Sequence, residues 1–244
     1  WFFAAFVMTL AARQAGLRHA ARTTQPMLQI TRGLLLALEI CVMVSAFVLL
    51  GLVESHAIFA AYPLLVAALS GPILGEQVGW RRWTAILVGF IGILIILQPG
   101  LRVFSPYALI PVVSATLFAL YNLLTRLAAK KDDTATSFFY TGTVGAIAMT
   151  CVGIWFWEPM SAQNWLWMGA LCITGASGHW LLIKGYDVSE ASAVQPFAYL
   201  QLVFGAFFGI TIFGETLNWN VALGAAVVMA AGIFTLIRAN RRQT

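Results

Sequence analysis

Residues 74–97 read LGEQVGWRRWTAILVGFIGILIIL, and this stretch holds three signals that together predict the fold. Its second half, residues 85–97, is apolar on every side, which favours a membrane-spanning helix over the alternating polarity of a β-barrel strand. The composition agrees, with 61% hydrophobic residues, 9% charged residues and a mean hydropathy of +0.87. Soluble domains average about 45–50% apolar and about 25% charged residues. We therefore predict an all-α integral membrane protein.

Further apolar segments lie on both sides of this stretch, and most of them approach the length of about 20 residues that a span requires. Nine such segments are visible, at residues 1–12, 29–52, 56–74, 81–97, 106–127, 136–157, 165–183, 193–213 and 219–238. The first reaches Arg13 too soon to span, so we interpret it as a helix cut by the start of the chain. The pattern argues against a soluble enzyme, a nucleic-acid-binding protein and a disordered chain.

The second signal is Arg81-Arg82, because basic residues accumulate in cytoplasmic connections. When the connections and adjoining helix ends are taken alternately, 13 of the 14 lysines and arginines fall on one side. Arg102 is the exception. This pattern predicts a cytoplasmic C-terminus in a bacterial inner (plasma) membrane. It also explains the net charge of +5 without any nucleic-acid partner.

The third signal is a repeated motif. Gly75-Glu76 and Trp80 recur 139 residues later as Gly214-Glu215 and Trp219. Basic residues follow the first copy and not the second, so the two copies are expected on opposite sides of the membrane. Inverted-topology repeats of this kind are typical of carriers that work by alternating access. Duplication without transport is the alternative interpretation.

The motif also divides the chain. It follows the fourth helix of the second copy but the third visible helix of the first copy, so one helix is expected upstream of residue 1. The prediction is two inverted repeats of five transmembrane helices, of which nine are present here. The first repeat covers residues 1–97 and is incomplete, and the second covers residues 106–238.

The chain resembles the drug/metabolite transporter superfamily, in particular the bacterial ten-helix EamA-type branch. The resemblance rests on the segments Pro63–Glu76, Trp83–Gly100, Phe118–Arg126 and Pro196–Glu215. It implies two five-helix repeats and a carrier without a cofactor. Relatives in this branch include exporters of amino acids and metabolites and importers of S-adenosylmethionine or riboflavin. The last segment, preceded by Gly178-His179, is most similar to the S-adenosylmethionine uptake subgroup.

Glu39 is the one acidic residue predicted deep in a span. It lies ten residues into segment 29–52, near the midplane at about 1.5 Å per residue. Charged groups at that depth are costly and usually functional. The carboxylate is therefore a candidate for proton coupling or for binding a cationic part of the substrate. The alternative is a structural glutamate that bonds to a neighbouring helix.

His179 is the second candidate for proton coupling and substrate binding, because an imidazole titrates near neutral pH. A structural histidine is the alternative. Gln195 and Tyr199 share one helix face beside Pro196, a stripe that suits a cavity wall or interhelix packing. Further substrate-binding candidates are Tyr62, Tyr121 and Asn122.

Two groups of residues are expected to have structural roles. Arg32 and Arg126 lie near span ends, so we expect their side chains to extend to lipid headgroups. The expected helix-contact glycines are Gly71, Gly75, Gly205 and Gly209.

The function that these patterns favour is secondary transport of a small polar or amphipathic metabolite, such as an amino acid or a derivative. Proton coupling, exchange and facilitation all remain open. The alternatives are S-adenosylmethionine or riboflavin uptake and, in another class, a non-transporting membrane subunit or an intramembrane enzyme. No sequence motif for catalysis, a metal or a cofactor is visible, and the three cysteines lack ligand spacing. The expected partners are the metabolite and membrane lipid, and the expected state is a monomer or homodimer.

Overall fold

The computed structural model describes residues 2–14, 16–75, 79–97, 106–189 and 191–240, and in these ranges every regular element is a helix. The all-α prediction is confirmed for this part of the chain. The chain divides into two compact units. Unit 1 contains residues 1–37 and 124–189, and unit 2 contains residues 38–123 and 190–244. Each unit thus combines segments from both halves of the sequence.

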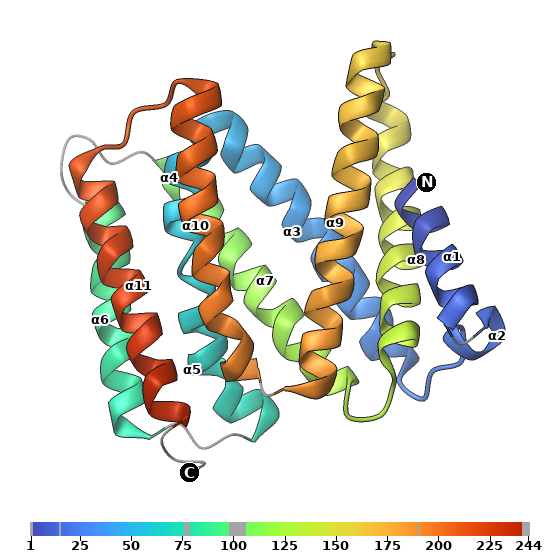
Figure 1. Cartoon of the computed structure of the whole chain (residues 1–244), viewed down its shortest axis with the longest axis horizontal. Coiled ribbons are helices and arrows are strands. Elements are labelled where there is room, and N and C mark those ends of the chain that lie inside the picture. Colours follow the sequence, from blue (N-terminus) through green and yellow to red (C-terminus); the bar gives the residue numbers. More distant parts are fainter. Residues whose placement is uncertain (1, 15, 76–78, 98–105, 190, 241–244) are drawn as a thin grey trace. The chain divides into compact units, whose positions relative to one another are not determined.

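Unit 1 is built around three helices that lie side by side in Figure 1. Its elements are α1 (Phe2–Gln14), α2 (Leu17–Ala20), the first part of α3 (Pro26–Leu50), the end of α7 (Leu109–Ala128), α8 (Thr134–Gly153), η2 (Ile154–Phe156) and α9 (Ala162–Val188). Helices α1, α8 and α9 enclose an apolar core that includes Val7, Phe138 and Ile183. A Cβ at Gly142 would lie 2.6 Å from Val7, so α1 and α8 approach closely at this glycine.

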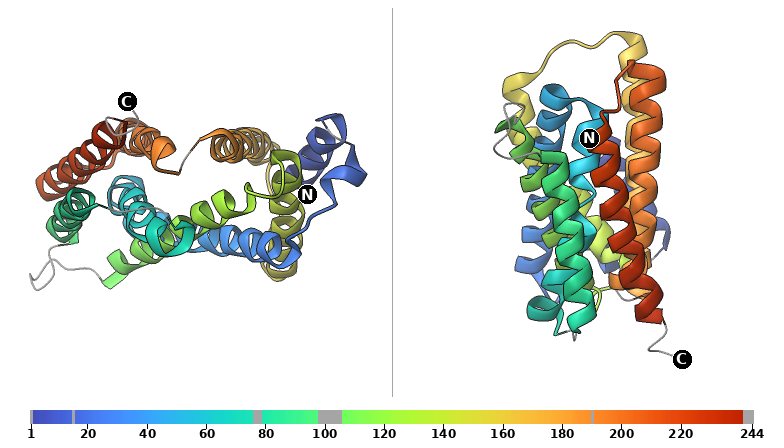
Figure 2. Two further views of the ribbon diagram at one scale, coloured as in Figure 1. Left: turned by 90° about the horizontal axis from the view of Figure 1, so that it is seen from below. Right: turned by 90° about the vertical axis from the view of Figure 1, so that its left-hand side faces the viewer.

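Unit 2 holds the remaining helices. Its elements are the rest of α3, α4 (Leu52–Phe59), α5 (Tyr62–Leu74), α6 (Trp80–Leu97), η1 (Pro106–Ala108), most of α7, α10 (Ala191–Phe213) and α11 (Trp219–Asn240). Its core contains Ile58, Leu64, Ile93, Leu202 and Val228, all with little or no exposure. Figure 2 shows α6 and α11 side by side from two further directions.

Glycines bring two helix pairs of unit 2 into close contact. A Cβ at Gly92 on α6 would lie 2.8 Å from the Gly224 carbonyl oxygen on α11, and a Cβ at Gly224 would lie 2.5 Å from the Gly92 carbonyl oxygen. Helix α10 approaches α4 at Gly205 and Gly209, where a Cβ would lie 2.8 Å from His56 and 2.6 Å from Val53 respectively. Small residues allow such backbone approach in membrane helices.

The helix-contact prediction is therefore confirmed for Gly205 and Gly209 and wrong for Gly75. A Cβ at Gly75 would meet nothing within 4 Å. Gly75 instead ends α5 with a left-handed backbone at φ +77°, the conformation that glycine adopts most readily at a helix C-terminus. The second half of the same motif, Glu76, lies outside the described residues.

Helix length and composition fit a membrane protein. Among the described residues, five helical stretches are long and apolar enough to cross a bilayer, at residues 26–50, 52–74, 106–128, 134–156 and 162–188. The four other predicted spans correspond to shorter apolar helices, at residues 3–13, 83–96, 200–213 and 219–234. Large apolar side chains are widely exposed, among them Val48 at 80% and Trp155 at 83%. Lipid is the solvent that favours such a surface.

Candidate functional site

The deep acid predicted from the sequence, Glu39, contacts a neighbouring helix. Glu39 on α3 is 5% exposed, and Ser114 on α7 is fully buried. The Ser114 hydroxyl donates a hydrogen bond to Glu39 Oε1 at 2.7 Å. Within the described part of the chain, Glu39 makes this one side-chain hydrogen bond. Glu39 and Ser114 both belong to unit 2. A buried carboxylate with one neutral donor retains the capacity to accept further bonds.

An aromatic cluster lies further along the same face of α7. Phe118 and Tyr121 follow Ser114 by four and seven residues, a spacing that places all three on one side of the helix. The Phe118 ring is 4.8 Å from the Tyr62 ring, edge to face, and 5.4 Å from the Phe59 ring. The Phe118 and Tyr121 rings stack at 5.8 Å. These centroid distances are typical of favourable aromatic pairs.

A break in one span brings two of these rings to α7. Helix α4 ends at Phe59 and α5 begins at Tyr62, with Pro63 in its first turn. Proline has no N–H and suits the start of a helix, so the sequence itself favours a restart here. The break lies within the apolar stretch 52–74, and at it the Ala60 and Ala61 N–H groups donate to the carbonyl oxygens of His56 and Ile58. Discontinuous helices of this kind form substrate sites in many carriers.

The structure gathers some of the predicted site residues and leaves others apart. Tyr62, Tyr121 and Asn122 are buried in unit 2, together with Glu39. The Asn122 amide donates to the Phe118 carbonyl oxygen at 2.6 Å, one turn earlier in α7. His179 belongs to α9 in unit 1. The side chains of Gln195 and Tyr199 lie outside the described residues, although their backbone belongs to α10.

Arg32 contradicts the expectation that its side chain extends to lipid headgroups. It is fully buried in unit 1. Its guanidinium donates to Thr125 Oγ1 at 3.1 Å, to Gln29 Oε1 at 2.9 Å, to Thr141 Oγ1 at 2.8 Å and to the Ser137 carbonyl oxygen. A buried cation is tolerated when polar oxygens replace its hydration. Arg32 therefore holds α3, α7 and α8 together.

The expectation that the Arg126 side chain extends to lipid headgroups is also wrong, because the guanidinium bonds to a neighbouring helix. Its guanidinium donates to the Tyr186 carbonyl oxygen at 2.7 Å, which joins α7 to α9 within unit 1. Tyr186 lies in the last turn of α9, where carbonyl oxygens accept no bond from within the helix and can accept one from a cation.

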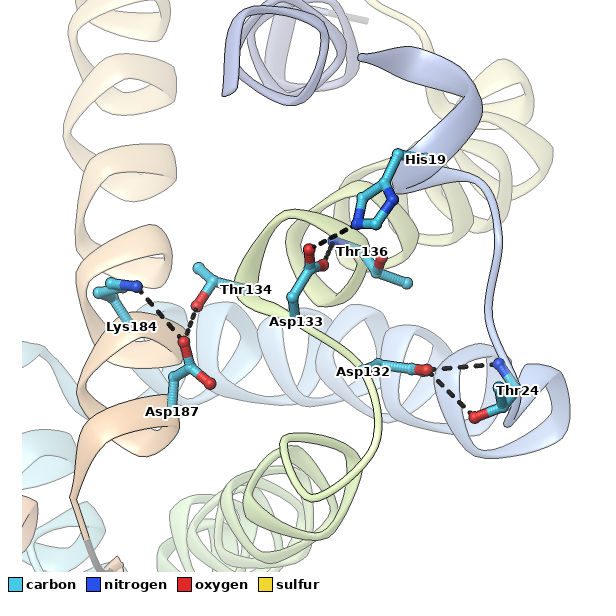
Figure 3. A network of polar contacts seen from close by, with 8 residues as sticks. All are labelled: His19, Thr24, Asp132, Asp133, Thr134, Thr136, Lys184 and Asp187. Atoms are coloured by element: carbon cyan, nitrogen blue, oxygen red, sulfur yellow. Dashed lines mark hydrogen bonds and ion pairs between the residues drawn. The ribbon is translucent and has the colours of Figure 1, made fainter. Parts of the chain in front are cut away.

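The connection between α7 and α8 carries a second polar network that the sequence reasoning missed (Figure 3). Asp132 is buried and accepts hydrogen bonds from Gln29 Nε2 at 2.8 Å and from the Thr24 N–H at 3.3 Å. Thr134 donates to Asp187 on α9 at 2.9 Å, and Lys184 pairs with Asp187 at 3.3 Å. The available signal was the Asp132-Asp133 pair directly before a helix start.

Asp133 has two roles in this network (Figure 3). Its side chain caps α8 by accepting from the Thr136 N–H at 2.8 Å, and it pairs with His19 Nε2 at 2.9 Å. Burial alone would raise the pKa of Asp133, but the bonds from Thr136 and His19 outweigh burial and hold the pKa below its usual value. The folded state thus favours the charged form of this carboxyl.

Comparison with known proteins places the chain in a family. The model of the EamA-like transporter family matches residues 105–237, more than half of the chain. The chain belongs to the EamA-like transporter family. It is a multi-pass membrane protein of a transporter family, not of an enzyme family. The resemblance noted in the sequence is thereby confirmed.

Similar members of this family carry different small molecules. The chain is 27% identical over 222 residues to the S-adenosylmethionine uptake transporter of Rickettsia prowazekii, covering 90% of this chain and 74% of that protein. It is 30% identical over 229 residues to the riboflavin transporter of Rhizobium johnstonii, covering 92% and 74%. It is 24% identical over 226 residues to the pseudopaline exporter of Pseudomonas aeruginosa, covering 92% and 79%.

One crystal structure of another protein shares the fold of this EamA-like chain. It has a TM-score of 0.70 at 18% sequence identity and covers the whole of this chain and 86% of its own. At that identity the likeness extends to the fold alone.

Proposed function

We propose that the protein is a secondary carrier that moves a small polar or amphipathic metabolite, such as an amino acid or a derivative, across a bacterial inner membrane. The observation that carries the proposal is the cluster at the α4–α5 break. Glu39 bonds to Ser114 on α7, and one turn further along α7 Phe118 contacts Tyr62 of α5 and stacks on Tyr121. A buried carboxylate one helical turn from aromatic rings at a helix break has the chemistry of a substrate site.

Alternating access between inverted repeats 1–97 and 106–238 is part of this proposal. The spacing of 139 residues between the two motifs relates Gly92 to Ala231 and Gly224 to Ala85. Gly92 and Gly224 are in backbone contact between α6 and α11, and Ala85 and Ala231 are both 4% exposed. Small residues at both pairs of related positions are what a two-fold pseudo-symmetric pairing of α6 with α11 requires.

The chemistry of the cluster favours a substrate with a cationic group. A carboxylate attracts an ammonium or sulfonium group, and aromatic faces attract cations as well. S-adenosylmethionine carries both groups, and a similar protein at 27% identity is an uptake transporter for it. Uptake of S-adenosylmethionine is therefore the first alternative to amino-acid transport. Riboflavin is the second, because a similar protein at 30% identity is a riboflavin transporter and a flat ring system suits a site with aromatic side chains.

Glu39 and His179 are the two proposed proton-coupling residues. A carboxylate and an imidazole within spans are the side chains that carry protons in many carriers. Glu39 belongs to unit 2 and His179 to unit 1, so each residue needs its own test. In the membrane the protein is expected as a monomer or a homodimer.

Flux measurements on the full-length protein in proteoliposomes test the proposal. Labelled lysine, alanine, S-adenosylmethionine and riboflavin are supplied with and without an imposed pH gradient. We expect saturable uptake that is strongest for a cationic substrate, and we expect the pH-driven part of this uptake to fall at least tenfold in Glu39→Gln. Absence of saturable flux for every compound would refute the carrier and favour a non-transporting subunit or an intramembrane enzyme.

A further inference from the structure

Glu215 caps a helix that is remote in sequence. It lies in the segment between α10 and α11, and its carboxylate reaches the start of α4. Oε1 accepts from the Leu52 N–H at 2.7 Å, and Oε2 accepts from the Val53 N–H at 2.7 Å. The first N–H groups of a helix have no partner within the helix, and a side chain normally supplies one. Here the residue before α4 is Gly51, which has no side chain, and Glu215 takes that role.

Glycines leave the room that the carboxylate occupies. A Cβ at Gly51 would lie 2.8 Å from Glu215 Oε1, and a Cβ at Gly209 would lie 3.1 Å from Oε2. Gly51 also has φ +80°, a conformation that other residues rarely adopt. The Glu215 N–H donates to the Gly209 carbonyl oxygen at 3.0 Å, so the turn after α10 presents the side chain. The space at the start of α4 in unit 2 therefore fits the Glu215 carboxylate.

The cap coincides with the close contact between α4 and α10. His56 on α4 packs against Gly205, and Val53 packs against Gly209. The His56 ring also stacks on Phe47 of α3 at 5.0 Å. Helix α4 is only eight residues long, and its last residue is Phe59 of the aromatic cluster. Any rotation or shift of α4 at its capped end is therefore passed within two turns to the ring of Phe59.

We propose that Glu215 is a positioning residue. By binding the two N–H groups at the start of α4, it holds α4 on α10 and sets the places of Phe59 and Tyr62 against α7. The favourable charge of a carboxylate at a helix N-terminus adds to the two hydrogen bonds. The link from this cap to substrate affinity rests on the proposed function, whereas the cap itself rests on the contacts of Glu215 alone.

Hydrogen exchange and transport in the full-length protein test the two parts separately. Glu215→Gln keeps the size of the side chain but replaces one accepting oxygen with a donor, so one of the two N–H groups loses its partner. We expect amide exchange in peptides from residues 51–59 to rise about tenfold. We also expect the substrate KM to rise about fivefold, with a smaller change in maximal rate. Glu158→Gln is the control, since Glu158 is an exposed acid before α9 in unit 1.

A second variant covers the case in which Glu215→Gln fails to fold. Glu215→Asp keeps the charge but shortens the side chain by one methylene group, so the carboxylate should no longer reach both the Leu52 and Val53 N–H groups, and exchange in the same peptides should increase. Equal exchange in wild type, Glu215→Asp and Glu215→Gln would overturn the cap. Faster exchange at residues 51–59 with an unchanged KM would overturn the positioning role. A wild-type protein without saturable flux would refute the proposed function, and the exchange comparison would still decide whether Glu215 caps α4.

Discussion

The hydroxyl of Ser114 on α7 donates a hydrogen bond to the carboxylate of Glu39 on α3, at 2.7 Å. This bond locates the acid at one end of a helix face that continues with Phe118 and Tyr121. The sequence places the four residues in two different spans, and the bond places the acid one turn of α7 from the first of the rings. Changes to either partner should therefore act on the proposed substrate site.

Removing the donor should weaken substrate binding. In Ser114→Ala the carboxylate of Glu39 loses the bond that orients it, and such a bond contributes about 1 kcal/mol. We expect the KM for the transported substrate to rise about fivefold in proteoliposomes. Thr116→Ala is the control, because the Thr116 hydroxyl bonds to the Val112 carbonyl oxygen of its own helix. An unchanged KM in Ser114→Ala would show that the bond between Ser114 and Glu39 does not contribute to substrate binding.

Neutralising the acid should separate proton coupling from exchange. Glu39→Gln cannot bind and release a proton at this position, so we expect loss of pH-driven accumulation while substrate counterflow continues. The measurement is uptake of labelled substrate with an imposed pH gradient, compared with counterflow in the same vesicles. Glu158→Gln, an exposed acid in unit 1, should retain both activities. Normal pH-driven uptake by Glu39→Gln would remove Glu39 from the coupling mechanism.

Arg32 should be required for the stability of unit 1. Replacing it with methionine removes the four hydrogen bonds to Gln29, Thr125, Ser137 and Thr141 and leaves buried acceptors without a donor. We expect the free energy of unfolding to fall by about 3 kcal/mol. Thermal unfolding in detergent measures the loss. Arg22→Met, at an exposed arginine, is the control. Similar stability of the two variants would show that the network contributes little.

The Asp133 cap should make stability depend on pH. Because the pKa of Asp133 is lower when the protein is folded, its charge stabilises the fold above the unfolded pKa of about 4. That contribution is lost as the pH falls through the lower, folded pKa. We expect wild type to exceed Asp133→Asn in unfolding temperature at pH 6 and the difference to shrink below about pH 4. Asparagine keeps a helix-capping oxygen, so the comparison isolates charge.

The contact between α6 and α11 should reject a larger residue. In Gly92→Val the added Cβ would lie 2.8 Å from the Gly224 carbonyl oxygen, and backbone must move to accept it. We expect a loss of about 2 kcal/mol, measured by thermal unfolding. Gly145→Ala is the control, because a Cβ there meets nothing within 4 Å. A neutral Gly92→Val would mean that the two helices are free to separate.

The helical fold and the apolar spans were predictable from the sequence, whereas the two inverted repeats stay a prediction. Hydropathy located the spans because lipid requires about 20 apolar residues per crossing and leaves no partner for open backbone. The expected segment 56–74 begins within the structure's helical stretch 52–74, and segment 106–127 agrees with 106–128 to one residue. A span requires a run of apolar residues that are neighbours in the sequence. The order of residues along the chain is therefore sufficient to locate it.

The polar contacts were not predictable in the same way. Arg32 and Arg126 lie near span ends, where an arginine can extend to lipid headgroups or bond to buried partners. The packing of the helices brings Thr125 and Ser137 to Arg32. It brings the Tyr186 carbonyl oxygen to Arg126. Glu39 was found because an acid at mid-span is costly wherever it points. Its bond to Ser114 depends on the rotation of α3 against α7.

Glu215 shows most directly how the sequence and the folded structure differ in what they reveal. The order of residues was sufficient to show that a Gly-Glu motif ends one apolar helix and precedes another, because the motif occurs twice in the same setting. The cap that the Glu215 carboxylate forms on α4, more than 160 residues away, became visible only in the folded chain. Apolar burial depends on runs of neighbouring residues, whereas a hydrogen bond depends on the distance between two particular atoms.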